Sequence, residues 1–201
     1  MEFTNGGLGH RFFLLNFWEL NMGKIVALID CQNDFIDGSL AVGYDKWSNA
    51  YNYIASKLLT EASEVIFTKD SHPVNHCSFK EQGGPWPSHC VEGTKGCDFY
   101  WKLNEFIRIG DIPTSILKKG QDYSKEEYGI NVLKNKSGIE EVHIAGLCTD
   151  YCVKESSIMT AKENSNTTVY VHLQGSCYIA EDTKNKAIEE MKQYSNIKII
   201  L

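Results

Sequence analysis

Residues 24–30 read KIVALID, a continuous apolar run that ends in the carboxylate of Asp30. A run without polar alternation is typical of a strand that is buried on both faces, as in a parallel sheet. Further strands are expected at 64–68 (EVIFT), 115–117, 141–145 (EVHIA), 167–173 (TTVYVHL) and 196–201 (NIKIIL). The run at 24–30 is thus the first of about six expected strands.

Segments with helical periodicity separate several of these strands. Apolar residues recur at helical intervals from 47 to 60, and helices are also expected at 149–162 and 181–193. Strands that alternate with helices predict right-handed crossovers and a mostly parallel sheet with helices on both faces. We therefore expect an α/β fold of three layers, α-β-α, around a mostly parallel central sheet.

The 201 residues are enough for one domain with a sizeable core. Residues 1–21 differ from the rest, because three glycines precede a short apolar run at 12–18 that is too short to span a bilayer. We expect 1–21 to be a poorly ordered or loosely docked N-terminal extension, and 22–201 to be the domain. The alternative for the extension is a short interfacial helix that helps a homo-oligomer to form.

Composition excludes several classes of partner. The formal net charge of −6 gives no basic surface for nucleic acid or for an anionic membrane. The seven cysteines are scattered and form no paired CxxC motif, so a structural zinc site is not expected. Without a convincing secretory signal, they indicate free thiols in the reducing cytoplasm.

Chemically useful side chains follow four of the expected strands. Asp30 ends the first, Asp70 and His72 follow the second, Lys118 and Lys119 follow the third, and Cys152 lies in the first helical turn after the fourth. In parallel sheets, ligands bind beyond the carboxyl ends of the strands, so these side chains are expected to meet. Taken singly, an acid at a strand end is more often a helix cap, and a lone cysteine is usually a small core residue.

Together, three of these residues could activate a thiol. A lysine ammonium and a helix N-terminus both favour the thiolate of Cys152. Asp30 would accept the thiol proton and later return a proton to a leaving amine. The turn before Cys152 can direct backbone N–H groups at a developing oxyanion. The pattern therefore predicts a nucleophilic cysteine.

A second group of residues has the chemistry of a metal site. Asp70 and His72 lie two positions apart, so on an extended strand they face one way. His89 would come from the long irregular segment 71–97 as a third ligand, and His76 is a further candidate. Three N/O ligands suit one divalent ion, with zinc, iron or manganese as alternatives. The competing interpretation is a surface acid beside a capping histidine.

Several segments together resemble the nicotinamidases of the isochorismatase-like cysteine hydrolase superfamily. The matching segments are ALIDCQNDFIDGSLAV (27–42), FTKDSHPVNHCSF (67–79), PWPSHCVEGT (85–94), ILKKG (116–120) and HIAGLCTDYCVKES (143–156). The resemblance covers residue 24 to about 200. It implies an isochorismatase-like hydrolase domain that converts nicotinamide to nicotinate and ammonia through a thioester, within NAD salvage. Pyrazinamide-like aromatic amides are implied as further substrates.

The resemblance also implies roles for individual residues. Asp30 matches the catalytic acid/base, Lys119 the lysine that completes the triad, and Cys152 the nucleophile. The backbone N–H groups of Cys148 and Cys152 match the oxyanion hole, with a cis peptide before Cys148. The remaining matches are the metal ligands Asp70, His72 and His89, and the ring-binding residues Phe35, Leu40 and Trp86.

Two departures from the family pattern stand close to the site. Cys148 replaces the usual alanine, which places a second thiol beside the nucleophile as either a redox-sensitive or an inert neighbour. The stretch 121–130 (QDYSKEEYGI) differs from the usual pocket cover, where Tyr128 is a candidate aromatic.

Other activities of the superfamily remain as alternatives. One is an amidase for a carbamoyl or ureido substrate, whose members lack the metal ligands. Another is isochorismatase itself, which does not need the cysteine. The third is a non-catalytic binding member of the fold, which the presence of Asp30, Lys119 and Cys152 disfavours.

Overall fold

The computed structural model describes residues 24–201, so the expected extension at 1–21 lies outside the described residues. Within 24–201, six strands form one sheet in the order β3-β2-β1-β4-β5-β6, and every neighbouring pair is parallel. The expected parallel sheet is confirmed. The strands are β1 (Lys24–Ile29), β2 (Ala62–Asp70), β3 (Thr114–Lys119), β4 (Glu141–Leu147), β5 (Thr168–Cys177) and β6 (Ile197–Ile200).

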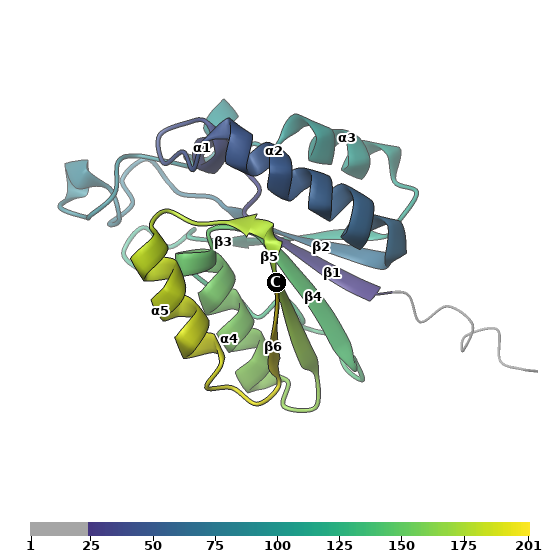
Figure 1. The fold of residues 1–201 in the computed structure, drawn as a ribbon. Coiled ribbons are helices and arrows are strands. Elements are labelled where there is room, and N and C mark those ends of the chain that lie inside the picture. Colours follow the sequence, from purple (N-terminus) through teal and green to yellow (C-terminus); the bar gives the residue numbers. More distant parts are fainter. Residues whose placement is uncertain (1–23) are drawn as a thin grey trace, which may run out of the picture.

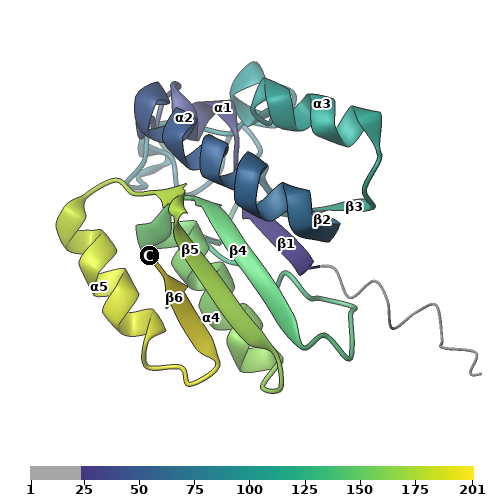
Figure 2. The same ribbon diagram turned by 45° about the vertical axis from the view of Figure 1, so that its right-hand side comes forward.

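Helices cover both faces of the sheet, as Figures 1 and 2 show. One layer holds α1 (Asn33–Ile36), α2 (Tyr44–Tyr53) and α3 (Trp101–Ile109), and the other holds α4 (Lys154–Glu163) and α5 (Glu181–Met191). Trp47 of α2 packs into a core with Leu28, and Met191 of α5 packs into a second core with Ile144. Burying each such side chain contributes about 1.5–3 kcal/mol. No helix in 24–201 is long and apolar enough to cross a membrane.

The structure changes two of the expected helices. The helix predicted at 47–60 begins at Tyr44 and continues past Tyr53 as a π-helical turn, Ile54–Leu58, and a 3-10 turn, Leu59–Glu61. The helix predicted from residue 149 likewise opens with a π-helical turn, Thr149–Val153.

Helix α3 was not expected from the sequence at all. Its signal is the glycine at its end: Gly110 has φ 72° and donates its N–H to the carbonyl of Phe106, a common way to end a helix. Only Leu103 of this helix is buried.

The order of the strands places a crevice between β1 and β4. The chain runs outward from β1 to β3 on one side of the sheet and from β4 to β6 on the other, and ligands bind at such a switch point. The two strands approach closely because Gly146 has φ 129° and no side chain. A Cβ atom there would lie 2.2 Å from the carbonyl oxygen of Ile29. The end of β1 therefore lies beside the turn that carries Cys152.

A chain of hydrogen bonds joins α2 to the sheet at some distance from that crevice. Tyr53 Oη contacts His172 Nδ1 at 2.9 Å, and His172 Nε2 contacts His143 Nδ1 at 2.8 Å. His143 Nε2 lies 3.4 Å from a carboxylate oxygen of Glu141. At least one of the two rings must be neutral, because in the contact between them one nitrogen donates and the other accepts.

We expect stability to fall on acidification because of this pair. Burial lowers the pKa of His172 from 6.5 to about 4, so the unfolded chain binds more protons than the folded one below about pH 6.5. The stabilisation is complete above that pH and is lost as the pH falls toward about 4. Thermal unfolding of His172→Gln should show a weaker pH dependence between these values. An equally steep decline in the variant would contradict this assignment.

Candidate active site

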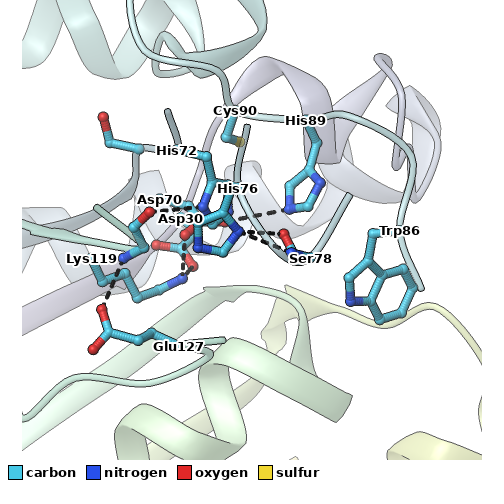
Figure 3. A network of polar contacts seen from close by, with 12 residues as sticks. Asp30, Asp70, His72, His76, Ser78, Trp86, His89, Cys90, Lys119 and Glu127 are labelled. Carbon is cyan, nitrogen blue, oxygen red and sulfur yellow. Dashed lines mark hydrogen bonds and ion pairs between the residues drawn. The ribbon is translucent and has the colours of Figure 1, made fainter. Parts of the chain in front are cut away.

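Lys119 lies at the centre of a buried polar cluster at the end of β3. Its ammonium is 2.8 Å from Oδ2 of Asp30, 3.0 Å from Oδ1 of Asp70 and 3.7 Å from Sγ of Cys152. Figure 3 shows the lysine side chain reaching toward both carboxylates. Burial alone would lower the pKa of Lys119, but Asp30 and Asp70 raise it well above its usual range. The cluster therefore has a permanent positive charge between two acids and a thiol.

Asp30 is held at the end of β1 by Thr68 of the neighbouring strand. The Thr68 hydroxyl donates to Oδ1 of Asp30 at 2.6 Å, and the Asp30 N–H donates to that hydroxyl oxygen at 3.0 Å. Burial raises the pKa of the Asp30 carboxyl, and the Lys119 ammonium opposes this rise. A carboxylate with a raised pKa can accept a proton more readily at neutral pH, which suits a general base.

Cys152 lies in the same buried cluster, beside the Lys119 ammonium. Burial raises the pKa of Cys152 well above its usual value, and the opposing effect of Lys119 is smaller. The expected net shift toward the thiolate was therefore wrong, because the sequence does not show how completely the thiol is buried.

Asp70, His72 and His89 converge on one point next to the cluster. His72 Nε2 lies 2.8 Å and His89 Nε2 3.6 Å from Oδ2 of Asp70. One ligand atom of each residue lies within 4.8 Å of those of the other two, and all three residues are buried. The three residues expected as metal ligands are thus brought together.

The hydrogen bonds of the two histidines fit a metal ion. His72 Nδ1 lies 2.9 Å from the carbonyl oxygen of Gly120, and His89 Nδ1 lies 2.8 Å from that of Pro87. If each Nδ1–H donates to its carbonyl, each Nε2 carries a lone pair that faces Asp70. Three acceptors that face one another in a buried place are stabilised by a shared cation. The donor set of this group therefore suits a divalent ion.

His76 does not join these three ligands in the structure. Its ring packs against that of His72 with centroids 4.0 Å apart. However, Nδ1 contacts Ser78 Oγ at 2.6 Å and Nε2 contacts the Lys125 carbonyl at 3.0 Å. Both ring nitrogens of His76 thus contact protein groups.

A pocket opens onto Cys152 and onto the metal-binding group of Asp70, His72 and His89. Phe35, Leu40 and Trp86 all line it, as the resemblance implied. The Trp86 indole donates to the hydroxyl of Tyr128 at 2.9 Å and meets Tyr151 edge-on at 5.3 Å. Other lining residues that the sequence did not single out are Glu126, Glu127, Tyr151 and Ile179.

The turn between β4 and Cys152 has the expected backbone form. The peptide bond between Leu147 and Cys148 is cis. Burial also raises the pKa of the Cys148 thiol well above its usual value. Oxidation proceeds through the thiolate, so this shift favours the inert interpretation of Cys148.

The fold and the site together define an α/β cysteine hydrolase with an associated metal-binding group. Residues 24–199 match the family described as the isochorismatase domain, and the chain belongs to this family.

Individual relatives agree with this assignment. The nicotinamidase/pyrazinamidase of Mycobacterium tuberculosis is 32% identical over 188 residues, which cover 86% of this chain and 96% of that protein. The pyrazinamidase of Pyrococcus horikoshii, solved in complex with zinc, is 30% identical with a TM-score of 0.70, and the match covers 89% of this chain and 98% of that one. The yeast nicotinamidase bound to the inhibitor nicotinaldehyde is 25% identical with a TM-score of 0.76, covering 88% and 99%.

Proposed function

We propose that this protein hydrolyses nicotinamide to nicotinate and ammonia, and that it accepts pyrazinamide-like aromatic amides. The observation that carries the proposal is the contact of Lys119 with Asp30, Asp70 and Cys152, which joins the thiol to the metal-binding group in one pocket. The names of the relatives support the same activity. In the cytoplasm, this reaction would serve NAD salvage.

The chain's own residues supply each proton transfer of the reaction. Asp30 takes the proton of the Cys152 thiol while the sulfur bonds to the amide carbon. The C–N bond then breaks, and the nitrogen leaves as ammonia with the proton that Asp30 returns. Asp30 next takes a proton from a water molecule, whose oxygen bonds to the thioester carbon. The C–S bond breaks, Asp30 returns its proton to the sulfur, and nicotinate is released.

Backbone and ring contacts would hold the substrate during these steps. We assign the oxyanion to the N–H groups of Cys148 and Cys152, at the cis peptide that precedes the nucleophile. The aromatic ring would lie against Phe35, Leu40 and Trp86 in the lined pocket. These contacts would bring the carboxamide carbon to the sulfur.

A divalent ion would be held by Asp70, His72 and His89. When bound, it supplies a Lewis-acidic position for the ring nitrogen of the substrate and thereby orients the ring. Zinc suits this set of two imidazoles and one carboxylate, and iron or manganese are alternatives.

Ammonia release from nicotinamide by purified, metal-replete protein tests the proposal. Turnover is expected, and a chelator should suppress it. An N-carbamoyl amide serves as the competing substrate, because amidases for such substrates lack the metal group. No turnover of nicotinamide at micromolar enzyme, or a preference for the carbamoyl amide, would contradict the proposed function.

Removing one histidine ligand should separate binding from chemistry. His89→Ala leaves the ion with two protein ligands, so we expect metal affinity to fall and KM for nicotinamide to rise. The expected loss of affinity is about tenfold or more. Metal content after dialysis and steady-state kinetics measure both effects. Unchanged metal content in the variant would refute the assignment of His89.

A further inference from the structure

Gln32 makes three hydrogen bonds to backbone groups beside the site, although the reaction assigns it no role. Its side chain is fully buried, two residues after Asp30. Its amide oxygen accepts from the Asp70 N–H at 2.8 Å, and its amide nitrogen donates to the Asp70 carbonyl at 2.7 Å. The same nitrogen donates to the Cys97 carbonyl at 2.9 Å. Gln32 thus holds the backbone of Asp70 on both sides.

Gln32 is itself anchored where it lies. Its backbone forms an isolated antiparallel bridge with Phe99, and its N–H donates to the carbonyl of Asp30 at 2.7 Å. The amide therefore cannot follow Asp70 if that residue moves. Because both its backbone and its side chain are hydrogen-bonded, Gln32 restrains the position of the Asp70 backbone.

Asp70 is the residue whose position matters most for the site as a whole. Its Oδ1 contacts Lys119 at 3.0 Å, and its Oδ2 contacts His72 at 2.8 Å. The Asp70 carboxylate therefore contacts Lys119 with one oxygen and the metal-binding group with the other. A small shift of the Asp70 backbone would disturb both groups at once.

We propose that Gln32 is a positioning residue: it fixes the Asp70 carboxylate where one oxygen can bind the metal ion and the other can contact Lys119. This inference rests on the proposed function for its kinetic part, but its metal-binding part stands on the structure alone. Only an amide offers an acceptor for the Asp70 N–H and donors for two carbonyls. A carboxylate of the same shape would face the Asp70 and Cys97 carbonyl oxygens at hydrogen-bonding distance without a proton to share.

The test compares Gln32→Glu and Gln32→Met with a matched amide elsewhere. Asn196 also donates its amide to three backbone carbonyls, those of Ala161, Asn164 and Thr167, away from the site. Asn196→Asp therefore imposes the same chemical change and controls for a general loss of stability. Zinc affinity by chelator competition, kcat, KM and the unfolding temperature are measured for each variant.

Both Gln32 variants should lower zinc affinity by about tenfold or more, as loss of groups that orient metal ligands does. Both should also lower kcat and raise KM for nicotinamide. Asn196→Asp should lower the unfolding temperature and leave zinc affinity and kcat unchanged. Should Gln32→Glu fail to fold, Gln32→Met and Gln32→Asn provide the same comparison.

The inference is overturned if the Gln32 variants lose stability but keep zinc affinity and kcat within about twofold of the unchanged protein. That outcome would make Gln32 a purely structural residue, like Asn196. Zinc affinity is measured without substrate, so it tests the inference even if the unchanged protein does not hydrolyse nicotinamide. Failure of the proposed function and failure of this inference therefore give different results.

Discussion

Cys152→Ala is expected to lower kcat for nicotinamide by about a thousandfold or more while the metal stays bound. The substitution removes the sulfur that we propose as the nucleophile, which lies 3.7 Å from the Lys119 ammonium. It removes no atom of the group formed by Asp70, His72 and His89. Single-turnover ammonia release and metal content after dialysis measure the two effects.

A second buried cysteine provides the control for this variant. Cys177 is buried on β5, and its replacement by alanine removes a thiol of the same size without touching Lys119. Cys177→Ala should lose some stability and keep its activity. Residual activity of Cys152→Ala above about a thousandth would show that another group is the nucleophile.

The residues at the strand ends could be predicted because their signals are local. An apolar run followed by a polar residue marks where a buried strand ends, and the parallel sheet brings such ends together. Asp30, Asp70 and Lys119 follow from this rule, and the structure places them in contact. The pair Asp70 and His72 also meets, although β2 ends at Asp70 and His72 lies beyond the strand.

The supporting contacts could not be predicted, because they depend on residues far apart in the chain. Gln32 meets Asp70 because β1 and β2 are neighbouring strands, and it meets Cys97 because the long segment 71–97 folds back toward the end of β1. Tyr128 meets Trp86 across the pocket for the same reason. Periodicity and motifs describe one segment at a time, so these pairs carry no signal in the sequence.

The direction of the pKa shift of Cys152 could not be predicted from the sequence either. A lysine and a helical turn near Cys152 predicted a lowered thiol pKa, yet burial raises it. The outcome depends on the balance between desolvation and charge, which only the packed structure determines.

Replacing Lys119 by methionine should affect both stability and catalysis strongly. The ammonium is the common partner of Asp30 and Asp70, at 2.8 and 3.0 Å, and all three side chains are buried. Removing one member of a buried ion cluster leaves uncompensated charge and costs about 3–5 kcal/mol of stability. Activity should fall as well, because the thiolate that forms during attack loses its nearest cation. Urea unfolding and steady-state kinetics measure these losses.

A double variant separates the two effects of Lys119. In Lys119→Met with Asp30→Asn, one of the two unpaired carboxylates is gone, so much of the lost stability should return. Activity should not return, because the double variant lacks both the cation and the base. A single variant that unfolds within about 1 kcal/mol of the unchanged protein would mean that Asp30 and Asp70 tolerate each other without the lysine. The stabilising role given to the Lys119 ammonium would then be wrong.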